Sequence, residues 1–124
     1  MPEANTAFVF DPDPVERAWI VSALTPVVDM VVTLEASPTV AGMLRGQKLA
    51  CLIASAEPEE NFVLALVREL RRSGSALPAI ILGSHSAFRT AIEIARLDGT
   101  TFLERPLTTL QLRSAVRRAC QPGA

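Results

Sequence analysis

Residues 7–24, AFVFDPDPVERAWIVSAL, join a short apolar run to an amphipathic segment through a turn of alternating aspartates and prolines. The run Ala7–Phe10 is apolar on both faces, which is typical of a strand in a parallel sheet covered by helices on both sides. Asp13 can cap the following helix, the proline after it suits the first turn, and Glu16 can reach back to a free amide. We therefore expect a strand followed by a helix that ends at residue 23 or 24.

The same alternation of apolar and amphipathic stretches continues to the end of the chain. Its apolar runs predict four further strands at Asp29–Leu34, Leu49–Ala54, Ala79–Leu82 and Thr101–Leu103. The stretches between and after them predict a short helix opened by Ser37-Pro38 and ending near Gly46, helices at Phe62–Arg72 and Ala87–Leu97, and a last helix opened by the capping box Thr108–Gln111. This order indicates an α/β fold with a doubly wound parallel sheet of five strands and five helices.

Length and composition fit one domain over residues 1–124, with a core from about residue 6 to residue 120. The chain is 49% hydrophobic and 20% charged, which allows a continuous core without disulfides. Cys51 and Cys120 lack metal-ligand spacing, the amino terminus does not resemble a signal peptide, and no apolar run could span a membrane, so we expect a cytoplasmic protein.

The net charge of -1 provides no overall field that would attract nucleic acid or an acidic membrane. Arginines gather in two places, which we interpret as solvated helix faces: Arg68, Arg71 and Arg72, and Arg113, Arg117 and Arg118. The second group shares one face of the last helix. Because aromatic stacking residues are absent nearby, a partner-binding helix is favoured over a nucleic-acid-binding one.

Ligands of such sheets sit at the carboxyl ends of the strands, so functional residues are sought there. The residues at these positions are Asp11, Pro12 and Asp13 after the first strand, Ala54 and Ser55 after the third, Gly83 and Ser84 after the fourth, and Arg105 and Pro106 after the fifth.

Three segments carry a resemblance to a known family: residues 8–14, 77–82 and 102–107. They resemble the receiver domain of two-component response regulators (CheY-like), notably the subfamily that precedes nitrogen-fixation-type DNA-binding regulators. The resemblance spans nearly the whole chain and is most specific at residues 102–107. It implies a flavodoxin-like sheet with the strand order 2-1-3-4-5.

In that family, two acidic residues after the first strand hold Mg²⁺, an aspartate after the third accepts a phosphoryl group, a Ser/Thr follows the fourth, and a lysine follows the fifth. The corresponding residues here are Asp11 and Pro12, then Ser55 by ungapped counting or Ala54 by anchoring on Pro58, then Gly83 with Ser84 one residue late, and Arg105. The resemblance therefore implies a degenerate phosphorylation site. Asp11 and Asp13 are the residual Mg²⁺ donors, so we expect weak or absent Mg²⁺ binding and no cofactor.

The altered site suggests two arrangements for Arg105. Its side chain could turn toward Asp11 and fill the space that metal and phosphate take in relatives, or it could be solvated on a loop. The family's switch aromatic corresponds to Phe102. Because Gly83 lacks a hydroxyl to couple with it, we expect Phe102 to be a plain packing residue.

These features favour a degenerate receiver domain that is not an enzyme and acts by protein contact. In the family, the contact face is formed by helix four, strand five and helix five. Helix four has more apolar residues than one buried stripe needs: Phe88, Ile92, Ile94 and Leu97. We expect a homodimer or another protein partner at this face, with no membrane and no direct nucleic-acid contact.

Three alternatives remain open. Ser55 could be esterified as a non-standard acceptor, since we place it at an exposed loop start before acidic residues, although a turn serine is favoured. The chain could be the receiver part of a larger DNA-binding regulator. A small α/β enzyme is less favoured because no glycine-rich turn follows the first strand and His85 lacks an evident partner for general-base catalysis.

Overall fold

The computed structural model describes residues 5–58, 60–84 and 88–120. In this part of the chain, strands alternate with helices. The elements are, in order, β1 (Thr6–Phe10), α1 (Pro14–Leu24), β2 (Met30–Leu34), α2 (Val40–Arg45), β3 (Ala50–Ser55), α3 (Glu60–Arg72), β4 (Ala79–Gly83), α4 (Phe88–Ala95), β5 (Thr100–Glu104) and α5 (Thr109–Cys120). Five strands and five helices confirm the predicted composition of the fold.

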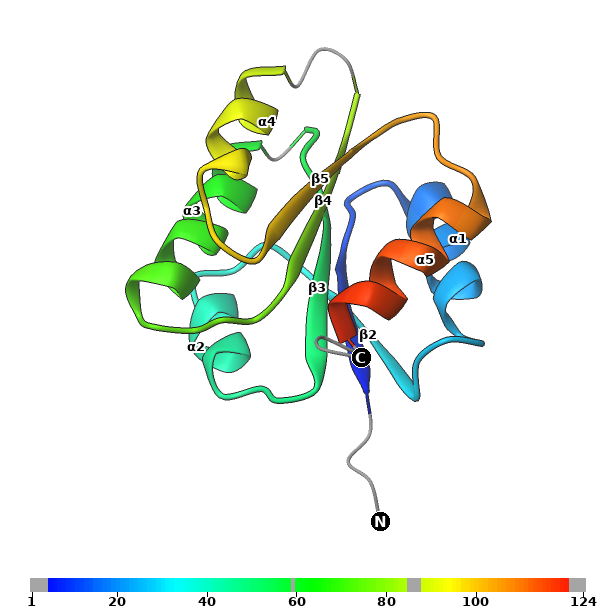
Figure 1. The fold of residues 1–124 in the computed structure, drawn as a ribbon, viewed down its shortest axis with the longest axis horizontal. Coiled ribbons are helices and arrows are strands. Elements are labelled where there is room, and N and C mark those ends of the chain that lie inside the picture. The colour runs from blue at the N-terminus through cyan, green and yellow to red at the C-terminus, as the bar shows by residue number, and fades with distance from the viewer. Residues whose placement is uncertain (1–4, 59, 85–87, 121–124) are drawn as a thin grey trace.

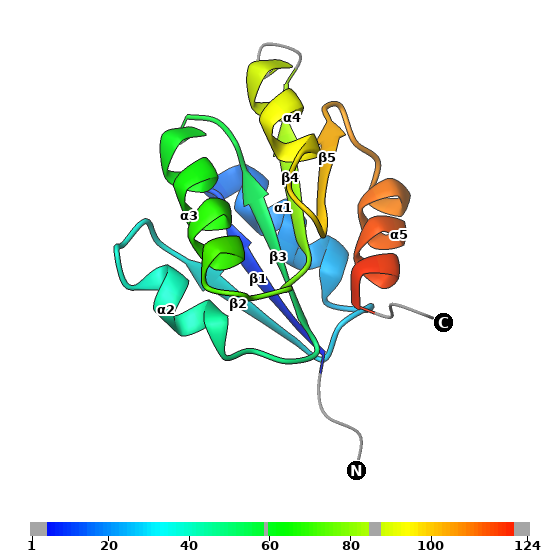
Figure 2. The same ribbon diagram turned by 60° about the vertical axis from the view of Figure 1, so that its left-hand side comes forward.

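The five strands form one parallel sheet in the order β2-β1-β3-β4-β5, which confirms the predicted topology. Figure 1 shows α2, α3 and α4 on one face of this sheet and α1 and α5 on the other. Figure 2 shows the same layers after rotation, with α4 and α5 flanking β5 at the edge of the sheet. The carboxyl ends of all five strands therefore lie together at one end of the sheet, which we call the carboxyl edge. The candidate site residues follow the strands there.

Each face of the sheet has its own apolar core because side chains alternate along the strands. Along β3, Leu52 and Ala54 join the core beneath α2, α3 and α4, whereas Cys51 and Ile53 join the core beneath α1 and α5. The amphipathic pattern of α3 is also confirmed, since its predicted apolar face is buried: Val63, Leu66, Val67 and Leu70.

The helix starts follow the sequence signals in two cases and differ in a third. Asp13 caps α1 as predicted, and the last helix has the predicted capping box, with Gln111 Oε1 accepting from Thr108 N at 2.8 Å and Thr108 Oγ1 accepting from Gln111 N at 3.1 Å. The prediction that Ser37-Pro38 opens the second helix is wrong, because α2 begins at Val40. The Ser37 hydroxyl instead accepts from Thr39 N at 3.3 Å in a turn before the helix.

Several boundaries shift by one or two residues. β3 begins at Ala50 rather than Leu49 and includes Ser55, and α3 begins at Glu60 rather than Phe62. α4 ends at Ala95, and the predicted start of this helix at Ala87 lies outside the described residues. Such differences are expected because helix and strand ends are defined by a few local bonds.

The interpretation of both arginine groups as solvated faces is wrong for one member of each. Arg71 lies half-buried at the end of α3 and bonds backbone carbonyls beyond its own helix, and Arg113 Nε donates to the Ala23 carbonyl of α1 at 2.7 Å. Arg117 and Arg118 are exposed. Arginines of one group therefore have different roles, since a long arginine side chain can reach a neighbouring element.

Within residues 5–58, 60–84 and 88–120, no helix combines the length and hydropathy needed to cross a bilayer.

Candidate functional site

Side chains from four segments converge at the carboxyl edge of the sheet. Asp11 follows β1, Ser55 ends β3, Ser84 follows β4, and Arg105 follows β5. Backbone bonds fix these ends relative to one another. Arg105 N donates to the Gly83 carbonyl and Ala56 N donates to the Leu82 carbonyl, both at 2.8 Å.

Arg105 lies at the centre of this site. Its Nε donates to Glu16 Oε1 at 2.6 Å, and its Nη2 donates to Ser55 Oγ at 2.7 Å. Two further carboxylates lie near, with Asp11 Oδ2 at 3.9 Å from Nη2 and Glu57 Oε1 at 4.0 Å from Nη1. The guanidinium therefore turns toward Asp11, as the first of the two predicted arrangements requires, and one cation faces three carboxylates.

Ser55 is buried at the end of β3, with 1% of its surface exposed. Its hydroxyl accepts from Arg105 and donates to the Glu57 carbonyl at 3.3 Å. The prediction that Ser55 lies at an exposed loop start is therefore wrong, because β3 extends one residue further than its apolar run suggests. Ala54 belongs to the core beneath α2, α3 and α4, so Ser55 rather than Ala54 faces the site.

Asp11 is a buried carboxylate whose two oxygens differ in their surroundings. Oδ1 accepts from Asp13 N at 2.9 Å, whereas Oδ2 has no hydrogen-bond partner within the described part of the chain and faces Arg105 at 3.9 Å. Burial raises the pKa of Asp11 from 3.8 to about 6; the Asp13 amide and Arg105 lower this pKa, and Glu16 raises it. The protonation state of Asp11 therefore changes at about pH 6, close to neutral pH.

Glu16 and Glu57 are site residues that the sequence did not reveal as such. The prediction that Glu16 reaches back to a free amide is wrong, because Asp11 already accepts from the Asp13 amide and Glu16 pairs with Arg105 instead. Glu57 accepts from Ser84 N and Ser84 Oγ, each at 2.8 Å, and so joins the loops that follow β3 and β4. The one signal for both was their position, close in sequence to strand ends that meet at one edge.

The remaining predicted residues surround this network. Pro12 is exposed, and Asp13 directs its carboxylate to the amides of Val15 and Glu16 as the cap of α1. Phe102 is partly buried on β5 and packs against the core beneath α2, α3 and α4, where it pairs with Ile81 of β4. His85 lies outside the described residues.

The residues present do not fit the Mg²⁺ ion that the receiver fold would imply. Arg105 lies among the oxygens of Asp11, Glu16, Ser55 and Glu57, so a positive charge already occupies the middle of the donor set. Among the residues that the structure describes, no group of three or more histidine, cysteine, aspartate or glutamate side chains is arranged to hold a metal ion. Mg²⁺ is bound through one or two carboxylates together with waters and phosphate oxygens, and here the carboxylates already face the guanidinium of Arg105.

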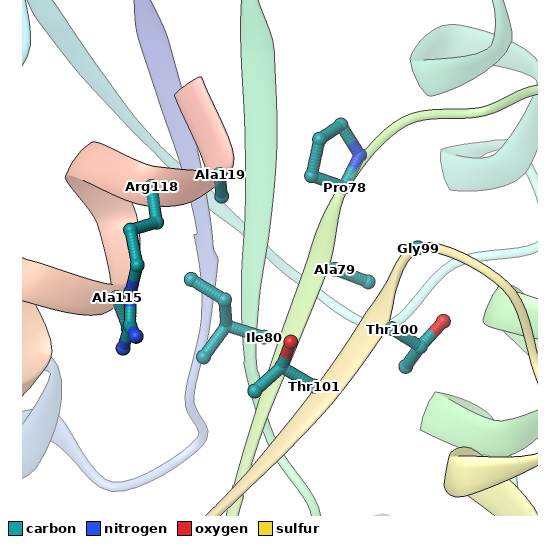
Figure 3. A pocket seen from close by; sticks show the side chains of 9 residues that line it. All are labelled: Pro78, Ala79, Ile80, Gly99, Thr100, Thr101, Ala115, Arg118 and Ala119. Carbon is teal, nitrogen blue, oxygen red and sulfur yellow. The ribbon is translucent and has the colours of Figure 1, made fainter. Parts of the chain in front are cut away.

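A separate pocket lies at the opposite end of the sheet, between the first residues of β4 and β5 and the second half of α5. Figure 3 shows Ile80 and Thr101 directed toward α5 and Arg118 along the side of this space. Its volume is about 530 Å³. Among the residues that the structure describes, no carboxylate lines this pocket, so we assign the candidate site to the carboxyl edge instead.

No family model matches the sequence. No curated protein matches it either.

Solved structures do match the fold. The N-terminal signal receiver domain of a two-component response regulator from Bacteroides fragilis is 17% identical with a TM-score of 0.78, and the match covers 95% of this chain and 98% of that one. FixJ-N is 18% identical with a TM-score of 0.81, over 100% of this chain and 98% of that one. Full-length FixJ from B. japonicum is 20% identical with a TM-score of 0.76, over 95% of this chain and 60% of that one.

These matches agree with the strand order and the helix placement. The chain has the fold of the receiver domains of two-component response regulators.

Proposed function

We propose that this protein is a degenerate receiver domain that acts in two-component-type signal transduction by protein contact, without phosphorylation and without catalysing a reaction. The observation that carries this proposal is the contact between Ser55 and Arg105. The resemblance to receiver domains assigns Ser55 to the phosphoryl acceptor and Arg105 to the cation beside it. A hydroxyl held by a guanidinium cannot form the acyl phosphate that an aspartate forms.

The surroundings of Arg105 support the same proposal. In phosphoryl transfer, cations neutralise charge that develops on the phosphoryl oxygens. Here the guanidinium is already paired with Glu16 and hydrogen-bonded to Ser55. A phosphoryl group would have to displace these partners, so we propose that the site has a structural role and takes no Mg²⁺ or other cofactor.

We expect no phosphorylation of the wild-type protein by a small phosphodonor such as acetyl phosphate in the presence of Mg²⁺. Intact-protein mass spectrometry would measure this, with a phosphorylatable receiver domain as the positive control and a Ser55→Ala variant as the negative one. A hydroxylamine-labile phosphoryl group on the wild-type protein would contradict the proposal. A hydroxylamine-stable one that Ser55→Ala abolishes would favour Ser55 as a non-standard acceptor, which its burial disfavours.

The surface proposed for protein contact consists of α4, β5 and α5, which we call the α4/β5/α5 face. Among its described side chains, two large apolar ones reach solvent: Ile92 of α4 is 43% exposed and Leu110 of α5 is 73% exposed. A groove of about 650 Å³ runs between β5 and α5 and is lined by Phe102, Leu107 and Leu110, among others. Exposed apolar side chains beside a groove are typical of interaction surfaces.

We propose a homodimer through this face and predict that Leu110→Glu converts it to a monomer, because a carboxylate would then be buried at the interface without a partner. Light scattering at high micromolar concentration measures the change. Val15→Glu is the matched control, since Val15 is 78% exposed on α1, outside the face, and its substitution should leave the dimer intact. A wild-type protein that stays monomeric would contradict the homodimer and leave another protein as the partner.

We further propose a cytoplasmic location. The low cysteine content of the chain, two residues in 124, is consistent with a reducing compartment.

A further inference from the structure

Every nitrogen of the Arg71 guanidinium donates a hydrogen bond, and Nε and Nη2 connect the end of α3 to the start of β5. Nε donates to the Asp98 carbonyl at 2.6 Å, and Nη1 donates to the Ser75 carbonyl at 3.0 Å. Nη2 donates to the Gly99 carbonyl at 3.2 Å and to Thr100 Oγ1 at 3.3 Å. Three of these four acceptors belong to the turn that follows α4 and to the first residue of β5, so one side chain fixes this segment against α3.

Gly99 is adapted to this contact. Its φ of +71° is a left-handed conformation that other residues rarely adopt, and a Cβ at this position would lie 3.3 Å from Arg71 Nη2. Glycine therefore satisfies both the turn and the close approach of the guanidinium. Burial lowers the pKa of Arg71 and the Asp98 charge opposes this, which is consistent with a partly desolvated cation held for its hydrogen bonds.

A second arginine, one turn earlier in α3, joins α3 to α4. Arg68 Nη2 forms an ion pair with Glu93 Oε2 of α4. Figures 1 and 2 both show α4 standing beside α3. Arg68 is half exposed, so this ion pair contributes less than the buried contacts of Arg71.

The Arg71 contacts lie far from the candidate site along β5. Arg71 bonds Thr100, the first residue of that strand, whereas Arg105 follows its last residue, Glu104. The contacts by which α3 holds α4 and the start of β5 in place therefore do not depend on the side chains or ligands at the carboxyl edge.

We infer that Arg71 is a positioning residue that holds α4 and the start of β5 against α3. The hydrogen bonds of Arg71, and not the candidate site, then set the arrangement of the α4/β5/α5 face. The inference rests on the proposed function of that face. Because of these hydrogen bonds, a domain whose site is not phosphorylated has a binding surface that is already ordered. Less conformational entropy is then lost when a partner binds.

Amide hydrogen exchange on the full chain tests this inference. We expect Arg71→Ala to accelerate exchange in residues 88–101 by about tenfold or more, because local opening of residues 98–100 no longer breaks three hydrogen bonds to Arg71. Exchange in residues 103–107, next to the site, should stay unchanged. The matched control is Arg72→Ala, since Arg72 is the next residue of α3 and its side chain is 77% exposed.

Arg71→Lys distinguishes geometry from charge and replaces Arg71→Ala if that variant does not fold. An ammonium keeps the charge but cannot reach acceptors on both segments, so Arg71→Lys should also accelerate exchange in residues 88–101. Full protection in Arg71→Lys, or equal acceleration over the whole chain in either variant, would overturn the inference. Phosphorylation of the wild-type protein would overturn the proposed function but would leave this result unaffected.

Discussion

Replacing Arg105 by methionine lowers the free energy of unfolding at pH 7.5 by about 2–4 kcal/mol, because carboxylates at the carboxyl edge lose their cation. Glu16 loses a 2.6 Å charge-assisted hydrogen bond and Ser55 loses its donor, while Asp11 stays buried. Methionine replaces the aliphatic part of the arginine side chain with an uncharged chain, so the loss reports chiefly the guanidinium. Urea unfolding followed by the fluorescence of Trp19 measures it.

Arg117→Met is the control, because Arg117 is an exposed arginine of α5 and its substitution should change the free energy of unfolding by about 0.5 kcal/mol or less. A double-mutant cycle with Glu16→Gln then isolates the ion pair, and we expect a coupling energy of about 1–3 kcal/mol. Equal losses for Arg105→Met and Arg117→Met would show that Arg105 is solvated in solution, the arrangement that the structure does not have.

The fold could be predicted from the sequence because its signals are local and agree with one another. Apolar runs, the Asp13 cap and the Thr108–Gln111 capping box each depend on neighbouring residues, and all are present in the structure. The start of α2 was predicted wrongly because Ser37-Pro38 satisfies a turn as well as a helix cap. Choosing between the two depends on how α2 packs on the sheet.

The site could be predicted only in part. In a parallel sheet, ligands bind at the carboxyl ends of the strands. Topology alone therefore placed Asp11, Ser55, Ser84 and Arg105 at the carboxyl edge. The partners of Arg105 could not be predicted, because Glu16 is 89 positions away in the sequence and was already explained by a local capping motif. Arg71 was missed for a similar reason: a helical spacing of arginines does not show which one reaches carbonyls of a distant turn.

Replacing Asp11 by asparagine stabilises the protein at neutral pH. The pKa of Asp11 is raised to about 6 in the folded protein from 3.8, chiefly by burial, so the folded state holds this proton more tightly than the unfolded state. The contribution of Asp11 to stability is therefore fully present below about pH 4 and is lost as the pH rises through about 6. Asparagine carries no charge to bury, and its amide oxygen can still accept from the Asp13 amide.

We expect Asp11→Asn to raise the free energy of unfolding by about 1–3 kcal/mol at pH 7.5, with a gain that shrinks toward zero as the pH falls to about 4.5. Urea unfolding at both pH values measures the difference. The groups that face Asp11 also enter the comparison: Arg105 favours its charged form, whereas Glu16 disfavours it. Asp13→Asn is the control, because Asp13 is exposed and asparagine caps helices as well as aspartate does, so its effect should be small at both pH values. A loss of stability for Asp11→Asn at pH 7.5 would mean that the attraction between Arg105 and Asp11 outweighs the desolvation of Asp11. The charge of Asp11 would then stabilise the carboxyl edge rather than destabilise it.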